Sequence, residues 1–185
     1  MIHEDIKITD VKLSSNAPYF SNRSVSGRFQ KRYIGVQFYE LELTLNYMEK
    51  DTSKVKRFFA LHQQSQPFDF DLSYYSRYEG SVQGLVQTAQ QAPSSSRLIK
   101  LGVFSGVLEA GALIQFQNHS KLYTVTEDVK SGGTLKLFPS LRGQVQNGEQ
   151  ILYKNPKGKF ILTTEKLDFD IKSISTMKIK ATEVI

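Results

Sequence analysis

GALIQFQNHSKLYTVT, residues 111–126, holds two short apolar runs separated by a polar turn, and it sets the architecture of the chain. Later reversals are marked by Ser131-Gly132-Gly133 and Asn147-Gly148, where glycine and asparagine tolerate the positive φ that tight hairpins need. Short strands separated by frequent turns are typical of an antiparallel meander. When such a sheet closes into a barrel, its two edge strands pair with each other and leave no exposed edge. We therefore predict a small antiparallel β-barrel, on which we find no catalytic signature.

The composition excludes several classes of protein. The 185 residues are 39% apolar, which suffices for one good core or two small ones. No apolar run approaches the roughly 20 residues that cross a bilayer, so we expect no membrane partner. Glu4 and Asp5 stand where a signal peptide would be basic, so we expect no signal peptide and cytosolic synthesis. The absence of cysteine excludes disulfides and thiol chemistry, and the three scattered histidines give no four-ligand set for zinc. We find no other signature, so we predict no metal, cofactor-binding or catalytic residues.

The net charge is +6, and it permits attraction to nucleic acid or to an acidic protein surface. Eighteen acidic residues are interspersed among 24 basic ones, which is more typical of a soluble surface. The densest basic patch lies in a segment rich in serine and glycine, which indicates an exposed loop that touches water or a partner. The patch consists of Arg23, Arg28, Lys31 and Arg32.

The sequence pattern of residues 39–72 predicts a strand, a helix and a second strand. Leucines alternate with polar residues over 39–45, which is the pattern of a half-buried strand. Asp51-Thr52-Ser53 offers side-chain oxygens that can cap a helix start. We predict a helix over about residues 52–64, ended by Gln66-Pro67. Its expected core stripe consists of Val55, Phe58, Phe59 and Leu61.

A second candidate interface follows the second strand. Tyr74, Tyr75, Arg77 and Tyr78 place three aromatic rings around one guanidinium, a composition that anchors protein interfaces and also stacks nucleic-acid bases. We favour the protein interface, because single-strand binders usually spread their aromatic residues along a basic groove.

The middle of the chain suggests an insertion. Residues 83–96 become polar and almost uncharged, which predicts a linker. Residues 97–164 would then form the small barrel, closed by a hairpin at Asn155-Pro156-Lys157-Gly158. Alternation at 167–171 and 177–181 predicts two final strands. We expect residues 1–82 and 165–185 to share one core, with the barrel inserted between them.

Several stretches then resemble small tail-tip and baseplate proteins of long-tailed bacteriophages. The first half contributes Gly35 to Leu43, the helix with Phe58-Phe59, and Gln66-Pro67-Phe68. The second half contributes residues 108–111, 114–116, 118–128 and 137–142, which look like the family's inserted barrel, and Glu183-Val184, which looks like its final strand. The resemblance covers nearly the whole chain in order.

The resemblance implies a mainly β fold with one α-helix, a split β-barrel of tail-tube or distal-tail type, and an inserted small antiparallel β-barrel. It also implies a structural ring subunit of the virion tail, made in the host cytoplasm. Six copies would form a ring at the distal end of the tail tube and connect it to baseplate hub or wedge proteins. DNA would pass through the channel and contact the subunit at most transiently.

Physical reasoning fits this expectation, because a head-to-tail contact whose rotation closes generates a ring. The basic stretch from Arg23 to Arg32 would be a hairpin or arm that lies on an adjacent subunit. Two alternatives stay open. One is a nucleic-acid-binding barrel, and the other is a hydrolase of cell-wall polymer. The hydrolase would have to use Asp69 with Asp71, or Asp168 with Asp170, although a solvated face explains both pairs better.

Overall fold

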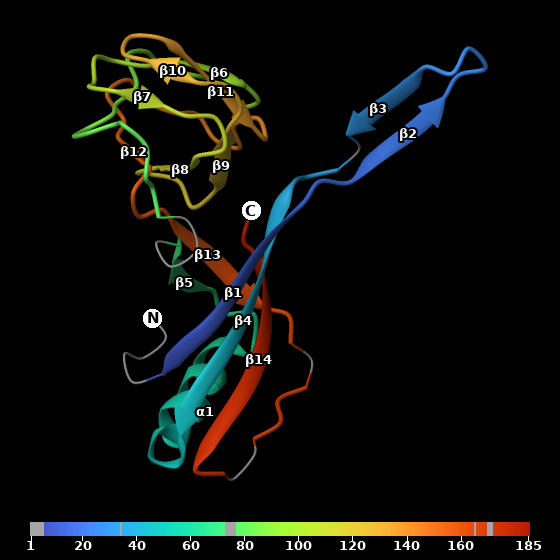
Figure 1. Cartoon of the computed structure of the whole chain (residues 1–185), viewed down its shortest axis with the longest axis vertical. Helices are drawn as coiled ribbons and strands as arrows, with labels where there is room; N and C mark the ends of the chain where they lie inside the picture. The colour runs from blue at the N-terminus through green and yellow to red at the C-terminus, as the bar shows by residue number, and fades with distance from the viewer. Residues whose placement is uncertain (1–5, 34, 73–76, 165, 170–171) are drawn as a thin grey trace.

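The computed structural model describes residues 6–33, 35–72, 77–164, 166–169 and 172–185. Figure 1 shows three parts: a lower body built on a curled sheet, an upper barrel-like unit, and a thin hairpin that projects to one side. Within the described residues the chain is mainly β with one α-helix, which confirms the general fold class expected from the sequence.

The body is a five-stranded antiparallel sheet in the order β1-β4-β14-β13-β5. Its strands are β1 (Lys7–Asn16), β4 (Phe38–Met48), β14 (Ile174–Glu183), β13 (Lys157–Leu162) and β5 (Phe68–Asp71). The leucines of β4 point into the core, as their alternation predicts, and Leu41 and Leu45 are fully buried. Because β4 pairs with β1 on one side and β14 on the other, the first and last strands share one core.

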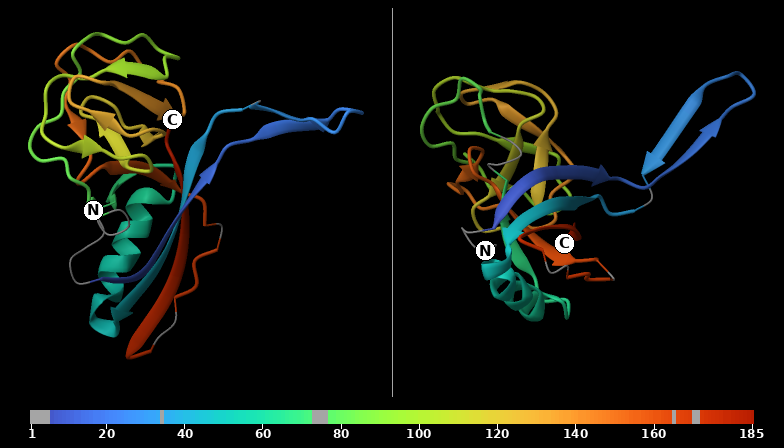
Figure 2. Two further views of the ribbon diagram at one scale, coloured as in Figure 1. Left: turned by 45° about the horizontal axis from the view of Figure 1, so that its top comes forward. Right: turned by 60° about the horizontal axis from the view of Figure 1, so that its bottom comes forward.

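Helix α1 (Thr52–His62) follows the short 3₁₀ turn η1 (Glu49–Asp51) and covers one face of the sheet (Figure 2). Val55, Phe58 and Phe59 are buried as predicted, but Leu61 is 57% exposed. At 100° per residue Leu61 lies roughly 110° from the centre of the buried stripe. The stripe continues instead through His62, whose ring centroid lies 4.9 Å from that of Phe58.

The predicted helix cap takes another form. Asp51 occupies the N-cap position, but its side chain makes no capping hydrogen bond. Its carboxylate forms an ion pair with Lys54 at 3.0 Å instead. The acidic side chain therefore stabilises the first turn through charge rather than through the backbone amides.

The barrel-like unit, here called the inserted unit, spans residues 77–156 and has a buried core of its own. Its strands are β6 (Leu98–Lys100), β7 (Val107–Leu108), β8 (Leu113–Phe116), β9 (Leu122–Val125), β10 (Val129–Lys130), β11 (Thr134–Phe138) and β12 (Ile151–Leu152). The main sheet runs β12-β8-β9-β11-β6, and β7 pairs with β10. Gly132 and Gly148 have φ of 68° and 75°, so the predicted turns occur where glycine is needed.

The segment expected to be a linker, residues 83–96, is instead part of this core. Val86 is fully buried and Ala92 is buried, while Thr88 bridges to Leu101 and Gln87 bridges to Gln150. The segment thus spans from the β6 side to the β12 side and closes the barrel. Its polar composition is typical of a linker. Its buried side chains, however, all lie at even-numbered positions, as expected for an extended segment with one face on the core. These are Val86, Thr88 and Ala92.

The boundaries at the end of the insertion also differ from those expected. Strand β13 lies in the body, between β14 and β5, although residues 157–164 were assigned to the barrel. The chain leaves the body after Leu72 and returns at Pro156, where the Leu72 amide donates to the Pro156 carbonyl at 3.1 Å. Residues 166–169 form no strand, although Leu167 and Phe169 pack partly buried against the body core.

Candidate assembly surface

The projecting hairpin, here called the arm, consists of β2 (Tyr19–Arg23) and β3 (Phe29–Tyr33) and continues from the ends of β1 and β4 (Figure 1). Tyr19 lies opposite Tyr33, and Arg23 lies opposite Phe29. The serine-rich tip closes through a hydrogen bond from the Ser24 amide to the Arg28 carbonyl at 2.9 Å. Gly27 has φ of 80° in this turn, a conformation that glycine adopts without strain.

The side chains of the arm face solvent along its whole length. All ten residues of β2 and β3 are exposed, and Phe20 and Phe29 are 62% and 61% exposed. Covering one such phenyl group would contribute about 1.5–3 kcal/mol. A hairpin that presents several large rings to water is a candidate surface for docking.

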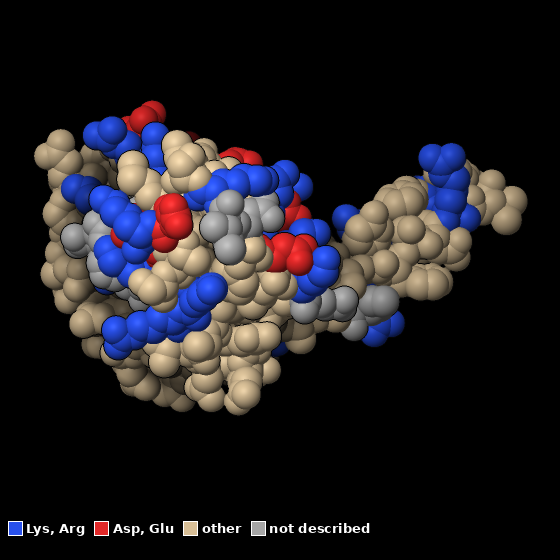
Figure 3. All heavy atoms as spheres, turned by 90° about the horizontal axis from the view of Figure 1, so that it is seen from below, with Lys and Arg blue, Asp and Glu red and all other residues tan. Residues whose placement is uncertain are grey.

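The arm also carries most of the molecule's net charge. Residues 19–33 contain four basic residues and no acidic one, against a total net charge of +6. Among the described residues, none of these four cations forms an ion pair. Lys31 lies 3.6 Å from the ring centroid of Tyr19, which is a cation–π contact. Figure 3 shows basic side chains and no acidic ones on the visible face of the arm.

The first group of predicted interface residues therefore lies together on the arm. Arg23 ends β2, Arg28 precedes β3, and Lys31 and Arg32 lie within β3. The exposed aromatic residues of the arm were missed in the sequence. The alternation of Phe29, Lys31 and Tyr33 was the available signal, because it indicates one face of a strand.

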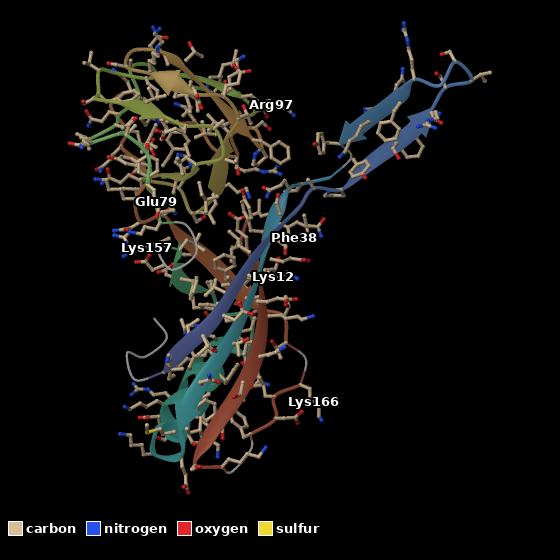
Figure 4. All side chains as sticks on the ribbon, in the orientation of Figure 1. Lys12, Phe38, Glu79, Arg97, Lys157 and Lys166 are labelled. Carbon is tan, nitrogen blue, oxygen red and sulfur yellow. The ribbon has the colours of Figure 1, made fainter. Side chains whose placement is uncertain are left out.

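The second group does not join the first. Tyr74 and Tyr75 lie outside the described residues, and Arg77 is exposed. The Tyr78 hydroxyl donates to Glu109 Oε2 at 2.6 Å, and its ring lies 4.8 Å from that of Tyr153. Figure 4 places the next residue, Glu79, on the side of the molecule away from the arm. Tyr78 is therefore anchored within the inserted unit.

This anchor predicts a pH dependence of stability. Burial and the hydrogen bond to Glu109 raise the pKa of Tyr78 to about 12, above its ordinary value of 10.0. Because the folded state holds this proton more tightly, the contribution is fully present below pH 10 and is lost as pH rises through about 12. The unfolding free energy of wild type minus that of Tyr78→Phe should therefore fall between these pH values in urea titrations. A difference that stays constant would contradict the anchor.

A buried ion pair lies where the base of the arm, the inserted unit and β14 meet. Lys121 Nζ contacts Glu183 Oε2, and these two side chains are 4% and 0% exposed. Lys121 also donates to Gln37 Oε1 at 2.8 Å. Gln37 in turn donates to Ser15 Oγ at 2.9 Å, so the network reaches both segments that lead into the arm.

Backbone groups complete this junction. The carboxylate of Glu183 accepts from the Leu122 amide at 2.8 Å and from the Tyr39 amide at 3.1 Å. Burial lowers the pKa of Lys121, and the attraction of Glu183 opposes that shift. Because one carboxylate binds groups of β4 and of the inserted unit, the junction links the body to the inserted unit next to the base of the arm.

Sequence reasoning missed this junction. Lys121 follows a polar turn and resembles a solvated residue. The position of Glu183 carried a signal, because it continues the inward alternation of Met177, Ile179 and Ala181 in β14. An acidic residue at an inward position indicates a buried partner.

The body sheet leaves two strands at its edges, β1 and β5. An edge strand offers unpaired backbone N–H and C=O groups to another chain. Strand β1 has ten residues and leads into the arm, so the arm and this edge form one continuous surface.

The carboxylate pairs considered for hydrolysis have basic neighbours. Asp69 and Asp71 lie opposite Lys159 and Lys157 in the β5–β13 ladder. Asp168 forms an ion pair with Lys166 at 3.1 Å, and Asp170 lies outside the described residues. The described part of the chain contains no cluster of three or more histidine or acidic side chains suited to a metal. None of its helices combines the length and apolarity needed to span a bilayer.

No protein-family model matches the chain, and no curated protein matches its sequence.

Proposed function

We propose that this protein is a structural subunit of the tail tip of a long-tailed bacteriophage. Six copies form a ring at the distal end of the tail tube, and the ring connects the tube to baseplate or hub proteins. The proposal rests on the resemblance of the sequence to such proteins. The structural observation that supports it best is the arm, which exposes Phe20 and Phe29 away from the molecule's own cores.

The arm is suited to a head-to-tail contact. It projects from one end of the body (Figure 2), so it can reach a surface of a neighbour that differs from the surface around its own base. A contact between two different patches generates a ring when its rotation closes. The free edge of β1 adds backbone groups that a neighbouring chain can pair with.

Mass photometry of the purified protein tests the proposal. We expect a species of six times the 21.0 kDa chain mass, in exchange with the monomer. Adding the tail-tube protein of the same virus should shift the population toward the ring, since a bound partner stabilises the state that binds it. A protein that stays monomeric both alone and with the tube protein would contradict the proposed function.

A further inference from the structure

A small notch lies between the base of the arm and the inserted unit. It has a volume of about 140 Å³, and its lining includes Arg97, Arg142, Tyr33 and Phe138 and no acidic residue. Both arginines are exposed, and neither forms an ion pair with another described residue. In Figure 4, Arg97 lies on the side of the inserted unit that faces the arm. The notch can therefore hold an anionic group between two guanidinium groups.

One face of the arm continues this notch. Residues directly opposite in an antiparallel pair share a face, and alternate pairs share the same one. The register therefore places Tyr19, Arg23, Phe29, Lys31 and Tyr33 on one face. The Tyr33 ring lies 5.5 Å from the Phe138 ring, which shows that this face turns toward the inserted unit.

The arm face and the notch form a surface here called the saddle. Its cations are Arg23, Lys31, Arg97 and Arg142, and its rings are Tyr19, Phe29, Tyr33 and Phe138. We propose that the saddle binds a single nucleic-acid strand. The four cations contact successive phosphates, and bases stack on the exposed rings. Basic grooves lined with aromatic side chains bind single strands in this way, without sequence preference.

The charge distribution favours a nucleic-acid strand over a second copy of this chain. Some acidic residues are already paired within the chain: Lys12 and Lys180 both lie within 4 Å of Glu42 in the body, and Lys136 pairs with Glu127 in the inserted unit. Asp69 and Asp71 face lysines across a ladder. A second copy carries 18 acidic residues interspersed among 24 basic ones and a net charge of +6, whereas a strand supplies one negative phosphate per nucleotide.

Fluorescence anisotropy with a labelled single strand of about 30 nucleotides and mixed sequence tests this proposal. Four phosphate contacts predict that affinity falls about 50-fold between roughly 50 and 200 mM salt. In the triple variant Lys31→Gln/Arg97→Gln/Arg142→Gln, the slope of log affinity against log salt should become shallower by about 2. A duplex of equal length should bind more weakly, because its bases offer no free faces for stacking.

A matched control removes the same charge elsewhere, through Lys50→Gln/Arg57→Gln/Lys130→Gln. All three residues are exposed and lie outside the saddle, in η1, α1 and β10. The proposal is overturned if the wild type does not bind the strand at low salt, if the control loses as much affinity as the saddle variant, or if the duplex binds as tightly.

Mass photometry of the same variants tests ring assembly independently of strand binding, so the two proposals can fail separately. The saddle variant should assemble like wild type, since the proposed strand site is independent of ring formation. Loss of assembly in the saddle variant, while the control assembles, would assign the saddle to a second copy of the chain instead. If no sample assembles but the wild type still binds the strand, the ring proposal is contradicted and the strand-binding proposal stands.

Discussion

Glu183→Ala should destabilise the protein by about 3–5 kcal/mol, the usual cost of removing one partner of a buried ion pair. The substitution leaves the Lys121 ammonium without its anionic partner. It also removes the acceptor of the Leu122 and Tyr39 amides. Urea unfolding followed by circular dichroism measures the loss, and hydrogen exchange at these two amides locates it at the junction.

Two variants serve as controls for this result. Lys136→Ala breaks the exposed pair with Glu127 and should cost no more than about 1 kcal/mol. The double substitution Lys121→Met/Glu183→Leu removes both charges and should be less destabilising than Glu183→Ala, because no buried charge is left alone. Equal stability losses in Glu183→Ala and Lys136→Ala would show that the junction does not depend on this pair.

Phe20→Ser/Arg28→Glu/Arg32→Glu should abolish ring assembly while leaving the monomer folded. Phe20 and Arg32 lie opposite each other on the face of the arm that turns away from the saddle, and Arg28 lies at the tip. Aromatic and arginine side chains supply most interface hot spots, and losing one costs about 2 kcal/mol or more, which is roughly 30-fold in affinity. Sedimentation velocity measures assembly, and circular dichroism verifies the fold.

The matched control for the arm is Leu85→Ser/Arg57→Glu/Lys130→Glu. It makes the same kinds of substitution at exposed positions outside the arm. We expect this control to assemble like wild type. If both triple variants assemble normally, the outer face of the arm is not the contact between subunits.

The local parts of the fold could be predicted from the sequence because their signals are local. The alternation in β4 and β14 and the apolar stripe of α1 each follow from the geometry of one element. The glycines at the tight turns likewise need no knowledge of the rest of the chain. The basic residues of the arm were found because they lie close together in sequence.

The remaining features depend on residues far apart in the chain. Residues 83–96 close the barrel through partners such as Leu101 and Gln150, which composition does not reveal. Strand β13 belongs to the body because it pairs with β5, across the whole insertion. The pair of Lys121 with Glu183 spans 62 positions, so neither residue by itself indicates the other.

Electron microscopy of the purified protein, alone and with its tail-tube protein, tests the ring proposal most directly. We predict closed rings with six-fold symmetry, in which the density of each arm crosses onto the neighbouring subunit. Particles that stay monomeric under both conditions, or closed rings whose arms point freely into solvent, would contradict an assembly held together by the arm.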